Sequence, residues 1–357
     1  MNKTKIAIIS DRFDIGGVSY VINTLSLNWC RYYDVKMFFF EKTKLAYDTH
    51  VDICFINHKP LIPVKFINKF INKFVYKFKL YLHLKKYSPD LIISFKTKPN
   101  IYTIMIAKYL KIPVIICEHG FHAGEKSNKT NKLRKKYYPK SNLLTVLTNA
   151  DYKYYDFVKN KIIMPNPIDI NLNENNIKKE NIILYVGRLE PEKSVDVFIK
   201  AMSKIKNINQ WRIQIAGDGS LKEELVELSK KYKLNIEFLG YIKNLHELYL
   251  KSKILCLTSE QEGLPIVLLE SIVCNCVRVS SDYIGVDDLI IDNYNGLIFK
   301  KGDYLDLANK INFIQENEQL CHNLTSNARK ILNNFDKKNI FKKWDIIIKN
   351  VTKEQYK

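Results

Sequence analysis

The chain has 357 residues, a length that predicts two domains at about 150 residues each. Aliphatic, aromatic and cysteine residues make up 46% of it and charged residues 26%, a balance that excludes a largely disordered protein. No apolar run approaches the ~18 residues that a membrane-spanning helix needs. The first apolar run, Lys5–Ser10, is followed by an acid, and it predicts a strand rather than a secretion signal.

The positive charge of the chain is concentrated in its first half. The formal net charge is +20, from 57 basic and 37 acidic residues. Residues 1–170 carry 29 basic and 12 acidic residues, a net charge of +17, whereas residues 171–357 carry 28 and 25, a net charge of +3. A positive field on one half predicts an anionic partner, which is a membrane surface, a nucleic acid or a phosphate-rich substrate.

The seven cysteines are scattered and form neither a CxxC pair nor a metal-ligand spacing. This pattern favours reduced, mostly buried thiols in a reducing compartment, so we expect a cytosolic protein.

Short apolar runs alternate with longer helical patterns in the first half, which indicates a parallel sheet wound with helices. The predicted buried strands are Lys5–Ser10, Leu91–Phe95, Val114–Cys117 and Leu143–Leu147. The predicted helices are Ser19–Tyr32, Leu61–Tyr87 and Tyr102–Leu110.

The turn-rich segment Met164–Asp169 and the polar stretch up to Lys179 form the best linker, and beyond them the alternation restarts. The second set of predicted strands is Ile182–Val186, Arg212–Ala216, Ile236–Leu239, Ile254–Leu257 and Val277–Ser280. The second set of predicted helices is Val195–Ile205, Leu221–Tyr232, Leu245–Lys251, Pro265–Val273, Tyr304–Gln315, Cys321–Asn333 and Asn339–Val351.

The expected fold class is therefore α/β, with two doubly wound, Rossmann-like domains facing across a cleft. We expect a basic N-terminal domain over residues 1–170 and a second domain over residues 171–335. We expect the C-terminal helix in residues 336–357 to pack back on the first domain. Ligands of such sheets bind at the carboxyl ends of the strands, so the cleft is the predicted site.

The first motif is Ser259-Glu260-Gln261-Glu262-Gly263-Leu264-Pro265, followed by Glu270. Gly263 lets the backbone approach a ligand closely, and Pro265 suits the first turn of a helix. The N–H groups of that turn favour a negative group such as a diphosphate. Glu262 lies in the loop before the helix, and Glu270 can accept hydrogen bonds from neighbouring sugar hydroxyls. The alternative is a capped amphipathic helix with two solvated acids.

The second motif is the strand end Leu184-Tyr185-Val186-Gly187-Arg188, continued to Lys193 and Ser194. The chain has 50 Lys and 7 Arg residues, so an Arg at this position is unusual for its composition. A guanidinium suits bidentate contact with phosphate, and Lys193 adds a compact charge. The alternative is a surface salt bridge from Arg188 to Glu190 or Glu192.

Three weaker signals lie at other strand ends. The Gly16-Gly17 pair follows the first strand, Glu118-His119 ends a strand of the basic half, and Gly217-Asp218-Gly219 ends another strand. Taken singly, each is more simply a tight turn or a structural His.

Five segments in order along nearly the whole chain form one pattern. They are Glu118-His119, Asn166-Pro167, Gly187-Arg188 with Lys193, Gly217-Asp218-Gly219, and Glu262-Gly263-Leu264-Pro265 with Glu270. With these segments the chain resembles the family 4 retaining glycosyltransferases of the GT-B fold.

The resemblance implies that Arg188 and Lys193 bind the diphosphate of an NDP-sugar donor, with a UDP-sugar expected. It implies that Glu270 holds the ribose and that Glu262, with the backbone of Gly263-Leu264-Pro265, engages the transferred sugar. His119 would lie beside the sugar and the acceptor, and Gly16 and Gly17 would line the phosphate and acceptor side. Ser194 departs from the family, which usually has Gly or Asn after the Lys.

The mechanism expected from the resemblance is sugar transfer with retention of configuration, without a metal or other cofactor. Arg188, Lys193 and the helix N-terminus at Gly263 would stabilise the leaving diphosphate. We favour front-face attack, in which the leaving phosphate helps to take the acceptor proton, over a covalent intermediate on Glu262.

The acceptor is predicted from the basic half. Phe66, Phe70, Phe74 and Phe78 recur every four residues, beside Lys65, Lys69, Lys73 and Lys77. Residues 59–86 hold eight Lys and no acid, and residues 126–140 hold seven bases and no acid. A crossover helix with a wet Lys face and an interfacial helix on an anionic bilayer explain the Phe stripe equally well.

For the whole basic half we favour the membrane, on its inner face. A lipid-linked glycan acceptor follows, as in bacterial capsule, O-antigen or similar surface polysaccharide assembly.

Three alternatives remain open from the sequence. A nucleic-acid-binding protein would fit the net charge, but no recognisable nucleic-acid-binding module is present, and we expect no nucleic acid partner. A glycoside hydrolase could use Glu262 and Glu270, but leaves Arg188 and Lys193 without a role. An NDP-sugar epimerase of similar fold would turn over the donor without an acceptor.

Overall fold

The computed structural model describes residues 3–43, 45, 47–57, 67–120, 128–170 and 178–353, and for residues 57 and 67–74 it describes the backbone. The chain divides into two compact units. Unit 1 comprises residues 1–167 and 338–357, and unit 2 comprises residues 168–337. The predicted boundaries after residues 170 and 335 lie within three residues of these positions.

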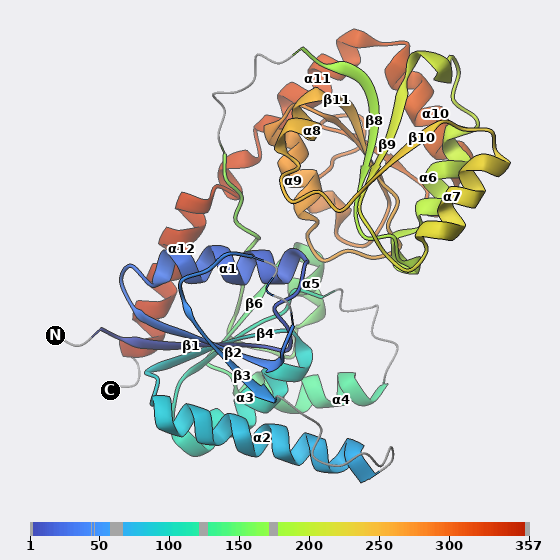
Figure 1. Ribbon diagram of the computed structural model, residues 1–357. Coiled ribbons are helices and arrows are strands. Elements are labelled where there is room, and N and C mark those ends of the chain that lie inside the picture. The colour runs from blue at the N-terminus through green and yellow to red at the C-terminus, as the bar shows by residue number, and fades with distance from the viewer. Residues whose placement is uncertain are drawn as a thin grey trace. The chain divides into compact units, whose positions relative to one another are not determined.

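The described residues of unit 1 contain a parallel sheet of seven strands in the order β3-β2-β1-β4-β5-β6-β7. The strands are β1 (Lys5–Ser10), β2 (Asp34–Glu41), β3 (Asp52–Asn57), β4 (Leu91–Phe95), β5 (Val114–Cys117), β6 (Leu143–Val146) and β7 (Lys161–Ile163). The helices are α1 (Gly17–Trp29), α2 (Ile67–Tyr87), α3 (Thr97–Leu110), α4 (Asn128–Tyr137), α5 (Asn149–Tyr154) and α12 (Lys337–Lys353). In Figure 1, α1 lies over one face of this sheet, and α2 and α3 lie over the other.

Unit 1 has near-continuous apolar strands because helices cover both faces of its sheet. Every residue of β4 is buried, and so are Ile6 to Ser10 of β1. On the α3 side of the sheet, Leu80 and Leu84 of α2 pack in one buried cluster with Ile92, Ile104 and Ile116. The C-terminal helix α12 also belongs to this unit, where the rings of Trp29 and Trp344 meet edge to face, 5.3 Å apart.

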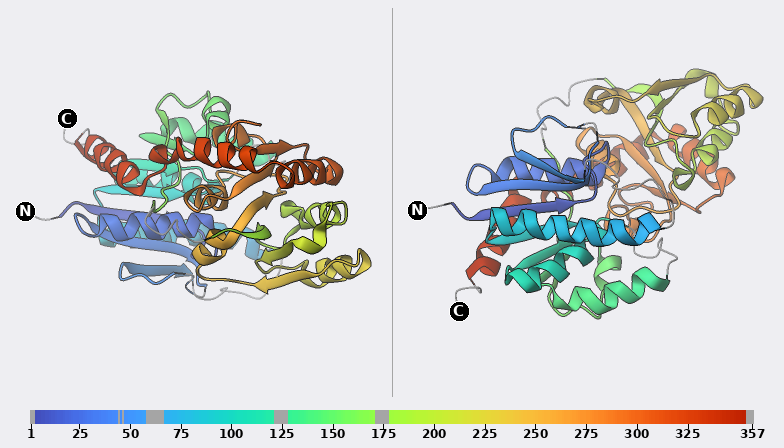
Figure 2. Two further views of the ribbon diagram at one scale, coloured as in Figure 1. Left: turned by 90° about the horizontal axis from the view of Figure 1, so that it is seen from above. Right: turned by 60° about the horizontal axis from the view of Figure 1, so that its bottom comes forward.

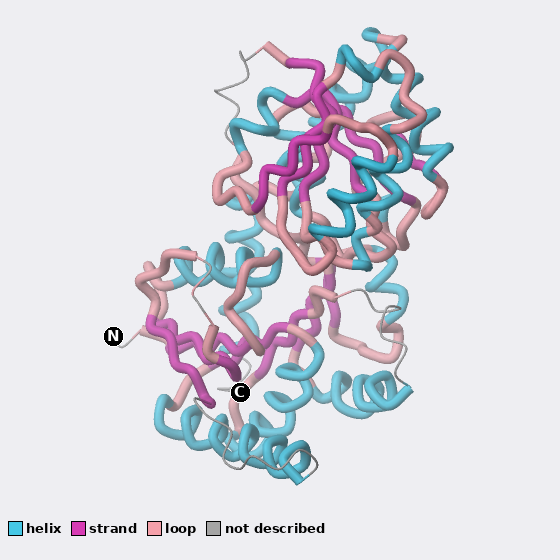
Figure 3. Tube along the Cα trace, turned by 45° about the vertical axis from the view of Figure 1, so that its right-hand side comes forward, coloured by secondary structure: helices cyan, strands magenta, loops and turns pink. Residues whose placement is uncertain are grey.

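The described residues of unit 2 contain a second parallel sheet, of six strands in the order β10-β9-β8-β11-β12-β13. The strands are β8 (Glu180–Val186), β9 (Arg212–Ala216), β10 (Ile236–Gly240), β11 (Ser252–Leu257), β12 (Val277–Ser281) and β13 (Leu297–Phe299). The helices are α6 (Val195–Met202), α7 (Lys222–Lys231), α8 (His246–Lys251), α9 (Ile266–Val273), α10 (Tyr304–Gln315) and α11 (Glu318–Arg329). Figure 1 shows α6, α7 and α10 on one face of this sheet and α8 and α9 on the other, and Figures 2 and 3 show the same elements from other sides.

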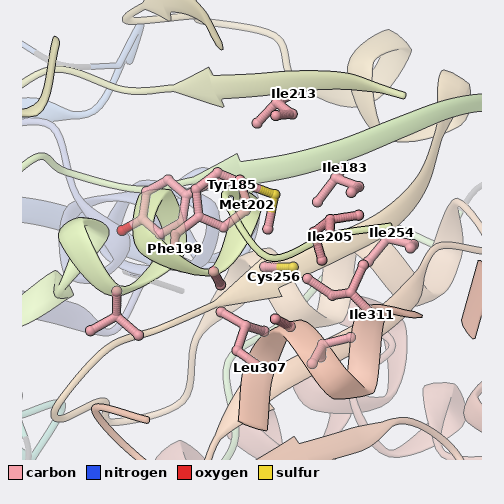
Figure 4. Close-up of a cluster of buried hydrophobic side chains, with 14 of the residues drawn as sticks. Ile183, Tyr185, Phe198, Met202, Ile205, Ile213, Ile254, Cys256, Leu307 and Ile311 are labelled. Carbon is pink, nitrogen blue, oxygen red and sulfur yellow. The ribbon is translucent and has the colours of Figure 1, made fainter. Parts of the chain in front are cut away.

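The core of unit 2 is built where the strands meet α6 and α10 (Figure 4). Ile183, Ile213 and Ile254 come from three neighbouring strands, and Leu307 and Ile311 come from α10. These side chains are at most 2% exposed, so they hold the sheet rigid under the loops at its carboxyl edge.

Local capping explains where several helices begin. The Asp303 side chain accepts hydrogen bonds from Leu305 N and Asp306 N at the start of α10, and Asn317 accepts from Leu320 N at the start of α11. The α3 helix ends at Lys111 in the left-handed conformation, and Pro113 follows. Among the described residues, no helix is both long and apolar enough to cross a bilayer.

Candidate functional site

The candidate donor site of unit 2 lies where the winding of the sheet changes direction. From β8 the chain continues to β9 and β10 on one side and then to β11, β12 and β13 on the other, so the switch point falls between β8 and β11. In doubly wound sheets, ligands bind outside the carboxyl ends of the strands at this point. The loops that follow β8 and β11 carry Gly187 to Ser194 and Thr258 to Pro265. They include the predicted donor-binding residues of unit 2 except Glu270, while Gly16 and Gly17 lie in unit 1.

Lys193 and Glu262 form the central contact of this site. The Lys193 Nζ atom lies 2.6 Å from Glu262 Oε1, and the two side chains are 17% and 13% exposed. Ser259 Oγ donates a second hydrogen bond to the same oxygen at 2.7 Å. The structure thus joins a cation and a carboxylate that lie 69 positions apart and that were predicted to share a ligand.

Further hydrogen bonds hold the two loops together. Thr258 Oγ1 donates to the Lys193 carbonyl at 2.9 Å, and the Glu260 N–H donates to the Glu192 carbonyl at 2.9 Å. Ser194 Oγ donates to Glu260 Oε1 at 3.3 Å. Because two of these hydrogen bonds end on the backbone carbonyls of Glu192 and Lys193, the Lys193 backbone is held by contacts other than its own ion pair.

Arg188 makes the surface salt bridge that the sequence left open as an alternative. Its Nη2 atom lies 2.7 Å from Glu192 Oε1, and the Arg188 side chain is 58% exposed. Glu190, the other candidate partner, instead accepts hydrogen bonds from the backbone N–H and the hydroxyl of Ser220, which lower its pKa. An exposed ion pair contributes little to stability, so Arg188 can exchange Glu192 for a phosphate at small cost.

Two glycines place the Arg188 loop. A Cβ atom on Gly217 would lie 1.8 Å from the Gly187 carbonyl oxygen, and one on Gly219 would lie 2.4 Å from the Leu189 carbonyl oxygen. The Leu189 N–H donates to the Asp218 carbonyl at 3.0 Å, which completes the contact. The loops that follow β8 and β9 therefore pack backbone against backbone, and no side chain fits between them.

The predicted helix start differs slightly from the observed one. Pro265 is the residue before α9 and not its first residue, and no side chain caps the helix there. The first turn also carries no acid. The Leu268 N–H donates to the Pro265 carbonyl at 3.2 Å. The N–H groups before it precede the first hydrogen bond of the helix and favour an anion, and Gly263 and Leu264 lead directly into them.

Glu270 lies in the second turn of α9 and is half-buried. Burial raises the pKa of Glu270 to about 7, while hydrogen bonding from Tyr249 and the charge of His246 act in the opposite direction. Both partners come from α8, which packs beside α9. The charge of Glu270 therefore changes within the physiological range.

Three further residues of this site were not predicted from the sequence. Ser259 contacts Glu262 directly, and Ser281 holds Ser259 through a 2.7 Å hydrogen bond to its carbonyl. The buried ring of Tyr185 packs on Phe198, with 5.6 Å between centroids, and its hydroxyl lies at the edge of the core (Figure 4). Burial and the charges of Glu262 and Glu192 raise the pKa of this Tyr185 hydroxyl. The position of Tyr185 as the last residue but one of a strand is a signal that was available in the sequence.

Gly16 and Gly17 lie in unit 1, where α1 begins after β1. A Cβ atom on Gly16 would meet no atom within 4 Å, so the protein itself does not require a glycine there. The glycine instead leaves the backbone open to a close approach from outside. No side chain caps α1, and its first turn carries no acid.

His119 lies one residue beyond Glu118, at the carboxyl end of β5 in the same unit. Its ring is 5.2 Å from that of Phe95, which ends the neighbouring strand β4. Burial and the nearby charge of Lys96 lower the pKa of His119 to about 3. His119 is thus neutral at physiological pH and suited to hydrogen bonding, not to donating a proton.

The basic helix is described in part. The side chains of Lys65, Lys69 and Lys73, and those of Phe66, Phe70 and Phe74, lie outside the described residues. Lys77 Nζ lies 5.1 Å from the centre of the Tyr102 ring, and Phe78 is 53% exposed. Among the α2 side chains that the structure describes, Leu80 and Leu84 are buried in the core and Tyr76, Tyr81 and Tyr87 pack against it. Phe78 is exposed, so the stripe that continues to it does not face the sheet at that point.

Arg134 belongs to the second acid-free stretch, residues 126–140, but its side chain is buried. It was counted among seven surface bases, but its side chain is 3% exposed and lies 3.7 Å from Glu118 Oε2. The positive charge that this stretch can present to a partner is therefore smaller by one than the sequence predicts. Among the described residues, no group of three or more His, Cys, Asp or Glu is arranged to hold a metal ion.

Comparison with known proteins gives matches over the whole chain. Residues 168–331 match the family model "Glycosyl transferases group 1". A Campylobacter jejuni protein is 32% identical over 354 residues, 97% of this chain and 99% of its own length. It is the "GalNAc-alpha-(1->4)-GalNAc-alpha-(1->3)-diNAcBac-PP-undecaprenol alpha-1,4-N-acetyl-D-galactosaminyltransferase".

A second C. jejuni protein is 26% identical over 302 residues, 75% of this chain and 80% of its own length. It is the "N,N'-diacetylbacillosaminyl-diphospho-undecaprenol alpha-1,3-N-acetylgalactosaminyltransferase". Among solved structures, Anabaena HepE in complex with UDP superposes with a TM-score of 0.80 at 18% identity, over 97% of this chain and 100% of HepE.

Proposed function

Because this chain belongs to the group 1 glycosyl transferases, we propose that it transfers a sugar from an NDP-sugar to a lipid-linked glycan with retention of configuration. Membership in a glycosyltransferase family and the GT-B fold class, both expected from the sequence, are confirmed. Family membership also favours sugar transfer over the hydrolase, epimerase and nucleic-acid-binding alternatives. The acceptor, the donor and the stereochemistry are the proposed part.

The observation that carries the donor assignment is the Lys193–Glu262 ion pair at the switch point of unit 2, with Arg188 on the same loop. On donor binding, the diphosphate would replace Glu262 as the partner of Lys193 and Glu192 as the partner of Arg188. The Glu262 carboxylate would then be available to the sugar hydroxyls. The N–H groups at the start of α9 add fixed donors for the negative charge of the leaving group. Glu270 would accept from the ribose when ionised.

These groups supply enough positive charge for departure of the diphosphate without a metal. Activity is therefore expected to survive exhaustive chelation with EDTA. Full restoration of a lost activity by Mg²⁺ or Mn²⁺, and not by buffer, would contradict this expectation.

We favour front-face attack, in which the leaving phosphate takes the acceptor proton. With donor bound, Glu262 would keep its hydrogen bond from Ser259 and bind the sugar hydroxyls, which suits a positioning carboxylate better than a nucleophile. His119, neutral as it stands, would orient a sugar or acceptor hydroxyl. Isolation of a sugar covalently bound to Glu262 during turnover would overturn this mechanism.

The acceptor proposal draws on the relatives, since both C. jejuni enzymes are named for acceptors joined to undecaprenol through a diphosphate. Both names also specify alpha linkages, which a retaining enzyme makes from an alpha-linked nucleotide sugar. In this chain unit 1 would hold such an acceptor, and unit 2 the donor. A place in the assembly of a bacterial surface polysaccharide, on the inner face of the membrane, follows from this proposal.

Contact with an anionic membrane would go through unit 1. On α2, Phe78 and Leu82 lie four residues apart and are 53% and 47% exposed, and Lys85 and Lys86 follow at the end of the helix. Exposed apolar side chains beside lysines are the composition of an interfacial helix.

The experiment that tests the function is a thermal-shift panel of NDP-sugars on the purified protein, repeated with Arg188→Ala. We expect one class of donor to stabilise the wild type, and the shift to vanish in Arg188→Ala. Arg212→Ala is the control, because Arg212 is 53% exposed against 58% for Arg188 and is also ion-paired, with Glu180 and Glu237, but begins β9, at the opposite edge of the sheet. Stabilisation of all three proteins to the same extent would refute the assigned donor site.

A further inference from the structure

Lys96 occupies the switch point of the other sheet. The unit 1 sheet changes direction between β1 and β4, and Lys96 is the first residue after β4. Its Nζ atom lies 2.8 Å from Oδ1 of Asp11, the first residue after β1. This ion pair therefore lies at the switch point of the unit 1 sheet, as the Lys193 loop lies at the switch point of the unit 2 sheet.

The backbone of Lys96 is strained. Its φ angle is +72°, in a region that a side chain with a Cβ atom rarely adopts. Hydrogen bonds fix it on both sides, because the Lys96 N–H donates to the Cys117 carbonyl and its own carbonyl accepts from the Asn100 N–H. Such outliers persist where the surrounding structure determines them, and they cluster at functional sites.

A buried polar network determines the position of Lys96. The next residue, Thr97, donates a 2.9 Å hydrogen bond to Glu118 Oε1 and accepts one of 2.6 Å from Arg134 Nη2. Glu118 also accepts from the Tyr138 hydroxyl and lies 3.7 Å from Arg134, with both charged side chains at most 3% exposed. Glu118 is thus fully used inside the protein, although it lies beside His119 in the sequence.

Lys96 is a cation at this edge that a ligand can reach, and Arg12, which follows Asp11 after β1, is a second one, 52% exposed and paired with Glu41. Lys96 and Asp11 are each 31% exposed, so their pair is open to exchange. His119, close enough for the Lys96 charge to depress its pKa, is neutral. A diphosphate carries more charge than one carboxylate, and it can therefore displace Asp11 from the ammonium group.

We propose that Lys96 binds the phosphate groups of a diphosphate-linked acceptor, exchanging its ion pair with Asp11 for the incoming anion. The Thr97–Glu118–Arg134 network holds Lys96 in its strained conformation for this purpose. The inference rests on the proposed function, because it concerns the acceptor of that same reaction.

The binding test uses inorganic pyrophosphate and calorimetry on the full chain. Arg188→Ala and Lys193→Ala are combined to suppress binding at unit 2, and Lys96→Met is then added. We expect the added change to weaken pyrophosphate at least tenfold, and Lys96→Arg to restore most of the affinity. Asp11→Asn should tighten it severalfold. The matched control is Lys108→Met, which removes an exposed charge at the far end of α3, the helix that begins directly after Lys96.

Lys96→Gly separates binding from folding. Glycine adopts φ +72° freely, so this variant should melt at a higher temperature than the wild type and yet lose pyrophosphate as Lys96→Met does. Absence of pyrophosphate binding in the Arg188→Ala/Lys193→Ala protein, or equal affinity with and without Lys96, would overturn the proposal.

The transfer test compares N-acetylgalactosamine on a farnesyl diphosphate with the same sugar on a neutral octyl group. Lys96→Met should raise the KM for the first acceptor at least tenfold and leave that for the second within twofold. An equal change for both acceptors would contradict the assigned role. If the wild type used neither acceptor, the proposed function would fail, while pyrophosphate binding would still decide the role of Lys96.

Discussion

Ser194 is the one position in the donor loop where this chain departs from the pattern that the sequence resembles, and the structure shows what the departure involves. Its φ and ψ angles are 46° and 48°, in the left-handed region that glycine and asparagine tolerate best. A residue with a Cβ atom is strained there. The loop holds Ser194 in this conformation at the cost of that strain.

Ser194→Gly is therefore expected to stabilise the protein by about 0.5–1 kcal/mol. Relief of the left-handed strain should outweigh the loss of the 3.3 Å hydrogen bond to Glu260. Chemical denaturation measures the change. The control is Ser203→Gly, at a position with φ −69° in the same unit, which should destabilise. A loss of stability in Ser194→Gly equal to that in Ser203→Gly would show that the conformation is not strained.

Glu270 gives the donor site a dependence on pH. A carboxyl whose pKa is raised to about 7 is protonated below that pH, and the ribose needs the ionised form as acceptor. Donor affinity should thus increase as the pH rises from 6 to 8, and Glu270→Gln should bind donor more weakly, with no such increase. Donor titrations at four pH values measure both effects.

Glu270 should affect stability with the opposite sign. Its pKa is higher in the folded state, so its favourable contribution is complete below the unfolded pKa near 4.5 and is lost as the pH rises through about 7. At pH 8, Glu270→Gln should melt about 2–4 °C above the wild type, and at pH 4, below the unfolded pKa, the two should agree. A difference that is the same at both pH values would mean that the proton is not involved.

At the scale of elements, the loops that follow β8 and β9 act as one unit. Gly217 and Gly219 touch the backbone of Gly187 and Leu189, and the Glu190 carboxylate binds Ser220. A loop so tightly packed cannot relax around an added methyl group. The position of Arg188 therefore depends on residues that contact no substrate.

Gly217→Ala should destabilise the protein by about 2–3 kcal/mol and abolish stabilisation by donor, because the new methyl group displaces the Gly187 carbonyl. Thermal melting with and without donor measures both losses. Gly302→Ala isolates the clash: its φ is +79°, but a Cβ atom there meets nothing within 4 Å. We expect it to cost about 1 kcal/mol and to leave donor binding intact.

Elements bounded by strong local signals were predicted well, and those set by tertiary contacts were not. Residues Tyr304–Gln315 were predicted as a helix and form α10, where Asp303 provides a clear cap. In contrast, β2 and β3 were not predicted, although β2 pairs with β1 and β3 pairs with β2. The segment Asp34–Glu41 mixes charged ends with a run of Phe, and its strand state depends on its pairing with β1.

The residues of the candidate site follow from the sequence because parallel strands bring their following loops to one edge. The pairing of those residues does not follow from it. Nothing local indicates that Lys193 would contact Glu262, or that Arg134, in a run of lysines, would be buried on Glu118. Such contacts depend on how distant segments pack, which periodicity does not record.

At the scale of the whole molecule, charge is divided between the parts of the chain, with +17 on residues 1–170 and +3 on the rest. The division matches the proposed tasks of an acceptor-binding unit near a membrane and a donor-binding unit. Each lysine near an anionic surface contributes about 1 kcal/mol, and exposed apolar residues add to that attraction.

Replacing Phe78 and Leu82 together by Ser should lower the fraction of protein that sediments with vesicles of anionic phospholipid at least threefold, because the pair is exposed on α2. Ile346→Ser, a change at an exposed position of α12, serves as control. Sedimentation of the wild type with neutral and anionic vesicles to the same extent would contradict the membrane proposal.

The return of α12 to unit 1 has a consequence for how the protein is made. A ribosome that has delivered residue 167 has supplied every strand of the first sheet, but not the helix whose Trp344 packs on Trp29 or the Asp345 that accepts from Tyr33 at 2.5 Å. All of unit 2 is translated before that helix. Unit 1, whose synthesis begins first, is therefore completed last. A nonsense mutation ahead of Trp344 should accordingly destabilise unit 1 and leave unit 2 folded.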